Sequence, residues 1–115
     1  MARTVIDLLQ LEDLVYIGDT GRYLYRSKPL ADVRTYATEL ARSLISDFGA
    51  KAIVVACNTA TTAAIQALRD HLSAMRIEVP VVGVEPVVKP AAQSSLSRHI
   101  AVLETECTAR SRRLA

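Results

Sequence analysis

The chain has 115 residues, half of them hydrophobic, which is the size and composition of one compact domain with a substantial core. Its 14 basic and 12 acidic side chains leave a net charge of +2, too small to indicate a nucleic acid or an anionic membrane as partner. No apolar run could span a bilayer, no secretory segment precedes the two cysteines and no zinc-binding spacing joins them to the two histidines, so we expect a cytoplasmic protein with free thiols and no metal.

Helical and extended patterns alternate along the chain. Residues 4–11 read as the last part of a helix, and four short apolar runs predict β-strands at 14–18, 52–56, 79–84 and 100–103. These runs are rich in β-branched residues and almost continuously hydrophobic, which is typical of strands buried on both faces of a parallel sheet.

Helices are predicted between these strands. Apolar residues at three- and four-residue steps fill positions 30–48, where Pro29 begins the segment and Gly49 ends it. A second apolar stripe covers 60–72, and a third helix is predicted to start near Pro86. Alternating strands and helices indicate right-handed βαβ units. We therefore expect an α/β fold, a parallel-sheet layered domain with helices on both faces.

Polar residues follow three of the predicted strands. They are 18–25 after the first, Cys57 to Thr59 after the second, and Glu85 with Pro86 after the third. In an open parallel sheet, ligands bind beyond the carboxyl ends of the strands. The shared position of the three clusters makes this edge the candidate site.

Cys57 stands where the second predicted strand meets a helix, in the segment VVACNTAT. Unpaired N–H groups and the positive end of the helix dipole favour the thiolate form there, which makes the sulfur a better base or nucleophile. A cysteine is also a small core hydrophobe. Asn58 and Thr59 suit helix capping, and they equally suit binding of a carboxylate at the helix N-terminus. The residues alone leave both interpretations open.

Four segments together resemble a known family. VYIGDTGRYLY, SKPLADVRTYATEL, GAKAIVVACNTATTAAIQALR and VPVVGVEPVVKPA occur in the order and with the gaps found in the first half of bacterial glutamate racemases. The similarity runs from Leu14 to Ala92, and HIAVLETECTARS resembles that family's next strand and loop. The combination of ACNTAT with GVEP is specific to the family. By this resemblance, residues 1–115 are part of the N-terminal domain of a glutamate racemase-like protein.

The resemblance implies a chemistry that needs no cofactor. Glutamate would lose its α-proton to one cysteine thiolate and receive a proton from a second cysteine on the opposite face, supplying D-glutamate for peptidoglycan. By analogy Cys57 is one of the two acid/base thiols. Tyr25, Asn58 and Thr59 would bind the substrate, and Thr61, further into the helix, is a weaker candidate.

Three departures from the family pattern bear on activity. The Asp-Ser-Gly-x-Gly-Gly loop and the Cys-Thr-His segment with the second catalytic cysteine are not in this sequence, and Arg26 replaces the glycine of a Pro-Tyr-Gly loop. Cys107 falls in a different loop, so it is not the second base. We expect the chain alone to be inactive. The alternatives are a non-catalytic α/β module that binds a carboxylate or a partner chain, and a racemase for another acidic amino acid such as aspartate.

The resemblance also implies that the family's first strand is missing. That strand would lie between the strands predicted at 14–18 and 52–56. Without it, the two strands either pair directly or leave open edges that favour association with another chain. We therefore expect a product that is poorly stable or that forms a homo-oligomer.

Overall fold

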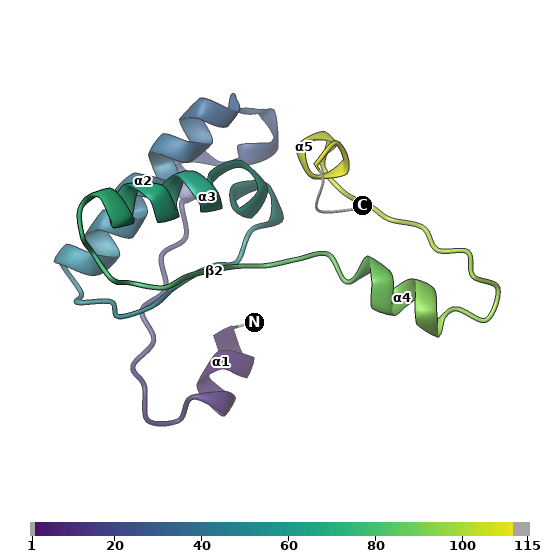
Figure 1. Cartoon of the computed structure of the whole chain (residues 1–115), viewed down its shortest axis with the longest axis horizontal. Helices are drawn as coiled ribbons and strands as arrows, with labels where there is room; N and C mark the ends of the chain where they lie inside the picture. The colour runs from purple at the N-terminus through teal and green to yellow at the C-terminus, as the bar shows by residue number, and fades with distance from the viewer. Residues whose placement is uncertain (1, 112–115) are drawn as a thin grey trace.

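A computed structural model describes residues 2–111 of the chain. In chain order the elements are α1 (Ala2–Leu8), the 3-10 turns η1 (Thr20–Arg22) and η2 (Tyr25–Ser27), α2 (Leu30–Ser46), β1 (Ile53–Val55), α3 (Asn58–Ala74), β2 (Val81–Gly83), α4 (Val88–Ser94) and α5 (Glu106–Ala109) (Figure 1). Within the described range, none of the helices has the length and apolar character needed to cross a membrane.

The two strands form a parallel sheet with α3 as the connection between them. Ile53 pairs with Val81 and Val55 with Gly83, and the Ile53 N–H donates to the Pro80 carbonyl at 2.9 Å. A parallel pair needs such a crossover because the chain must return to the same end of the sheet. The parallel sheet with its helices confirms the predicted fold class.

The core lies where α2 and α3 pack against each other and against one face of the sheet (Figure 1). Leu68 is its centre, with only 1% of its surface exposed. The other buried hydrophobic residues around it are Ala41, Ile53, Ile65, Leu72 and Val81. These positions on α3 recur at three- and four-residue steps, so the predicted apolar stripe is the face that the helix buries.

The boundaries of α2 follow the predicted signals. Pro29 occupies the N-cap position, where its missing N–H costs nothing. Gly49 follows the helix with φ of +64°, a left-handed conformation that favours glycine, and its N–H donates to the Ile45 carbonyl at 3.1 Å.

The opposite face of the sheet is only partly covered. Val54 and Val82, whose side chains point away from α3, are 49% and 53% exposed. Of the two helical layers that the sequence predicts, the residues from 2 to 111 therefore close one.

The segment 14–18 is not a strand, contrary to the sequence prediction. It starts beside Glu12, which pairs with Lys51 ahead of β1, and it ends at Asp19 near the opposite end of that strand. It therefore runs in the direction of β1, but among the described residues no backbone hydrogen bond joins the two. A strand needs a neighbour for its N–H and C=O groups. The segment stays extended and exposed, and the intervening strand remains a prediction.

The segment 100–103 is also not a strand, and among the described residues no strand pairs with the outer edge of β2. The Pro80 carbonyl faces β1, so the next carbonyl, that of Val81, faces away from it. Arg69 donates to this Val81 carbonyl from Nε at 3.1 Å and from Nη2 at 2.7 Å. A side chain thus takes the acceptor that a further strand would use.

Candidate active site

Cys57 lies at the carboxyl end of β1 and forms the N-cap residue of α3. Its backbone is extended, with φ of −111° and ψ of 124°, and its carbonyl accepts the Thr61 N–H at 2.8 Å. The thiol makes no capping hydrogen bond, and the residue is exposed. Among the described residues Cys57 is therefore not part of the buried core.

Asn58 and Thr59 bind a distant segment rather than capping their own helix. Asn58 Nδ2 donates to Oε1 of Glu104 at 3.2 Å, and Thr59 shares a hydrogen bond with Thr105 at 3.2 Å. Thr105 in turn shares one with the fully buried Thr108 at 3.1 Å. The first turn of α3 is thereby tied to the start of α5. The contact with Glu104 also shows that the Asn58 amide can donate a hydrogen bond to a carboxylate.

Thr61 connects the two strands where they diverge. Its hydroxyl donates to the Val55 carbonyl at 3.0 Å and accepts the Val84 N–H at 3.3 Å. Both ends of this bridge are backbone groups that would otherwise need another partner. Because the side chain is fully buried and its hydroxyl is committed on both sides, its role is structural.

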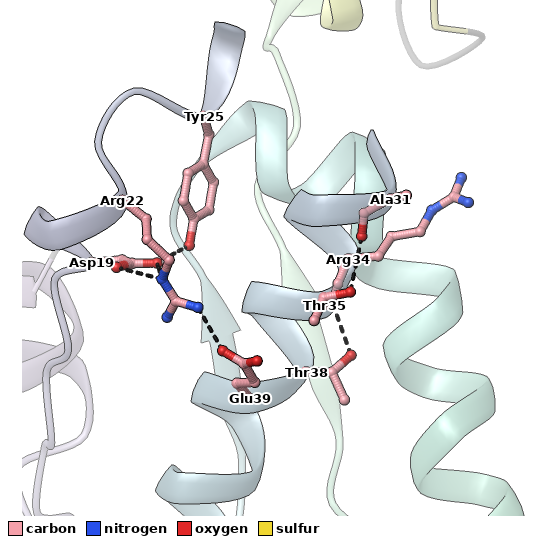
Figure 2. Close-up of polar contacts among 8 residues, drawn as sticks. All are labelled: Asp19, Arg22, Tyr25, Ala31, Arg34, Thr35, Thr38 and Glu39. Carbon is pink, nitrogen blue, oxygen red and sulfur yellow. Dashed lines mark hydrogen bonds and ion pairs between the residues drawn. The ribbon is translucent and has the colours of Figure 1, made fainter. Parts of the chain in front are cut away.

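Tyr25 belongs to a polar network that connects the loop after segment 14–18 to α2 (Figure 2). Its hydroxyl donates to Oδ2 of Asp19, and Arg22 Nε contacts the same oxygen at 2.8 Å. Arg22 also donates to Glu39 on α2 at 2.5 Å. The guanidinium carbon of Arg22 lies 4.3 Å from the ring centre of Tyr36, an arrangement typical of cation–π attraction.

These contacts shift the ionisation of two members of the network. Burial tends to raise the pKa of Asp19, but the hydrogen bonds from Tyr25 and Arg22 and the Arg22 charge outweigh it and lower that pKa. Burial and the hydrogen bond to the Asp19 carboxylate raise the pKa of Tyr25 well above its ordinary value of 10.0. Tyr25 is therefore a neutral hydroxyl donor and Asp19 a charged acceptor at neutral pH.

The lowered pKa of Asp19 predicts a pH-dependent contribution to stability. The network stabilises the fold fully above the unfolded-state value of 3.8, and this contribution is lost as the pH falls below it, because the carboxyl must then be protonated. We expect the difference in unfolding free energy between the parent and Asp19→Asn to be constant near neutrality and to shrink below pH 3.8. Urea unfolding at a series of pH values measures it. Thr20→Ala, a non-titrating neighbour, is the control, and a pH-independent difference for Asp19→Asn would contradict the prediction.

The structure brings Tyr25 to the same end of the sheet as Cys57. Tyr25 packs against the buried cluster of Val33, Ala60 and Ala63, and Val55, the last residue of β1, packs against the same cluster. Cys57, Asn58 and Thr59 form the start of α3, and Tyr25 packs beside it. The four residues that the sequence marks as catalytic or substrate-binding thus lie at one end of α3.

Glu85 and Cys107, two further residues considered in the sequence, lie in different environments. Glu85 follows two residues after β2 and is exposed. Cys107 lies within the short helix α5, not in an irregular loop, and is half-buried. Its neighbour Thr108 makes the contact described above, so this part of α5 serves as a support for the α3 N-terminus.

Sequence reasoning missed the residues that hold the site together. Glu104 and Thr105 directly follow the apolar run 100–103, so the rule that locates polar clusters at strand ends would have found them. Arg22 had no such signal. Its partner Glu39 is 17 residues away on another element, and nothing in the local pattern marks the pair.

A shallow, open depression lies at the opposite end of β2, and it is not part of this site. It is lined by Arg69, Ser73, Arg76 and residues 77–81. This is the amino end of the strand, whereas ligands of parallel sheets bind at the carboxyl end. Arg69 is also engaged with the Val81 carbonyl. We therefore place the candidate site at Cys57.

Comparison with known proteins finds glutamate racemases. The glutamate racemase of Methylococcus capsulatus is 44% identical over 109 residues, which are 95% of this chain and 38% of that protein. The one from Thermus thermophilus is 46% identical over 105 residues, covering 90% of this chain and 37% of that protein. The chain thus spans less than half the length of these curated relatives. No protein-family model matches it.

Solved structures give the same result. Glutamate racemase from Aquifex pyrophilus superposes with a TM-score of 0.67 at 36% identity, covering 82% of this chain and 35% of that one. The Thermus thermophilus enzyme in complex with beta-chloro-D-alanine gives a TM-score of 0.64 at 42% identity, covering 97% of this chain and 42% of that one. The predicted resemblance to part of a glutamate racemase is confirmed.

Proposed function

We propose that residues 1–115 are part of the first domain of a glutamate racemase-like protein, carrying one of two acid/base thiols for the interconversion of L- and D-glutamate. The observation that carries this proposal is the exposed Cys57 thiol at the N-terminus of α3, beside an Asn58 amide that already binds a carboxylate oxygen. An anionic substrate is favoured at such a helix end.

In this proposal the Cys57 thiolate takes the α-proton of glutamate. The proton passes to the sulfur, and the electron pair left on the α-carbon is delocalised into the substrate carboxylate, which the Asn58 amide and the Thr59 hydroxyl would hold. A second thiol must then protonate the opposite face. Cys107 is not proposed for this step, so the chain alone should turn over little substrate, and the product would serve peptidoglycan synthesis in the cytoplasm.

Binding can be tested separately from turnover by alkylation of Cys57. In a Cys107→Ser background, we expect glutamate to slow the reaction of Cys57 with iodoacetamide, and Asn58→Ala to remove that protection. Aspartate and an uncharged amide analogue of glutamate are the matched ligands. Protection by aspartate alone would indicate a racemase for another acidic amino acid, and no protection by either would contradict the proposed site.

Turnover has its own test. The parent chain is incubated with L-glutamate in D2O, and D-glutamate with deuterium at the α-carbon is sought, with Cys57→Ser as control. We expect no deuterated D-glutamate above the control.

The second candidate function, a non-catalytic α/β module, is favoured by the contact of Glu104 with Asn58, because the Glu104 carboxylate accepts the amide hydrogen bond that a substrate carboxylate would use. Deuterated D-glutamate formed only by the parent would exclude that second function and the expected inactivity.

A further inference from the structure

We propose that Asp19 is a positioning residue of the Cys57 site, acting through Tyr25. The inference rests on the proposed function for the identity of the site. It goes beyond the proposed function by assigning a role to a carboxylate outside the motif that contains the thiol. It also gives Tyr25, which the resemblance implies as a substrate-binding residue, the role of lining the site with its ring.

Asp19 holds two side chains of its own loop at once. Its carboxylate receives the Tyr25 hydroxyl and the Arg22 guanidinium at the same time, and its side chain is only 13% exposed. Arg22 is fixed in turn by Glu39 and by the Tyr36 ring, both on α2. The loop that carries Asp19 is thereby fastened to a helix of the core (Figure 2).

Tyr25 connects Asp19 to the Cys57 site, because its hydroxyl binds Asp19 and its ring packs near the start of α3. Its ring lies tilted at 41° to the Tyr36 ring, with ring centres 6.0 Å apart, and it packs against the buried cluster of Val33, Ala60 and Ala63. Its only proton is donated to Asp19, so the hydroxyl has none to give to a ligand. The ring therefore contributes its apolar surface beside the first turn of α3, at a position that Asp19 determines.

A double-mutant cycle tests the coupling. In the Cys107→Ser background, the rate of Cys57 alkylation by iodoacetamide is measured at one neutral pH for the parent, Asp19→Asn, Tyr25→Phe and the double variant. We expect Asp19→Asn to change the rate about threefold or more in the parent, and to have almost no effect when Tyr25 is already Phe. Asp70→Asn, an exposed carboxylate further along α3, is the control and should leave the rate unchanged.

A second measurement keeps the result interpretable. Near-ultraviolet titration of the tyrosines should show one hydroxyl that ionises late, which Asp19→Asn shifts to lower pH, Tyr25→Phe removes and Asp19→Glu restores. Circular dichroism confirms that each variant is folded. An equal effect of Asp19→Asn in both backgrounds would mean that Asp19 acts through its charge on the thiol, and would overturn the proposal. None of these readouts uses glutamate, so they can fail while the protection of Cys57 by glutamate succeeds, and the reverse.

Discussion

Replacing Leu68 by alanine is expected to lower the free energy of unfolding by about 2–5 kcal/mol. Leu68, on α3, is 1% exposed and belongs to the core cluster that also contains Ile53, Leu72 and Val81. Its removal loses the transfer energy of the side chain and leaves a cavity that the surrounding helices cannot fill. Because domains of this size are stable by only about 5–15 kcal/mol, the substitution should remove a large part of the stability.

The measurement is urea unfolding followed by far-ultraviolet circular dichroism. Leu8→Ala is the matched control, because Leu8 is helical but 76% exposed in α1, and its loss should cost little. Equal midpoints for the two variants would mean that the core is not organised around Leu68.

Gly83→Ala is expected to destabilise the chain by about 1–3 kcal/mol because the new methyl group has no room. A Cβ at this position would lie 2.3 Å from Cγ2 of Thr61 and 2.6 Å from Cδ1 of Ile65, both of them buried on α3. Either α3 must move away from β2 or Thr61 must rotate. Rotation would break the hydroxyl bridge between Val55 and Val84, so the loss should appear in stability and at the carboxyl edge of the sheet together.

Gly21→Ala is the control for this substitution, since a Cβ at Gly21 meets nothing within 4 Å. Thermal unfolding of both variants, with amide hydrogen exchange at Val84, distinguishes the two sites. A Gly83→Ala variant as stable as Gly21→Ala, with unchanged exchange at Val84, would contradict the close packing of α3 on β2.

The parts of the fold that sequence reasoning predicted are those determined by neighbours in the chain. The period of apolar residues and the flanking Pro29 and Gly49 mark α2, and the apolar stripe marks α3. The segments 14–18 and 100–103 are short apolar runs like those of β1 and β2, but they form no strand. Composition indicates that a segment can be a strand, whereas a hydrogen-bonded neighbour decides whether it is one.

For the candidate site, too, the sequence predicts features that depend on chain neighbours but not contacts between distant segments. The position of Cys57 between β1 and the N-terminus of α3 follows from the local pattern, whereas its exposure is seen only in the structure, because the residues alone also allowed a buried packing role. The partners of Asn58 and Thr59 do not follow from that pattern either, because Glu104 and Thr105 are 46 residues away. Tyr25 was expected to bind substrate, a role that remains untested, and its hydroxyl is instead found on Asp19.

The tie between the first turn of α3 and residues 104–108 has a consequence for how the chain can vary. It closes a loop of 46 residues whose outer part, around α4, extends away from the core (Figure 1). The entropy of closing such a loop depends weakly on its length, about 0.6 kcal/mol for each doubling. Insertions or deletions around α4 should therefore be tolerated at little cost, provided that Thr105 still reaches Thr59.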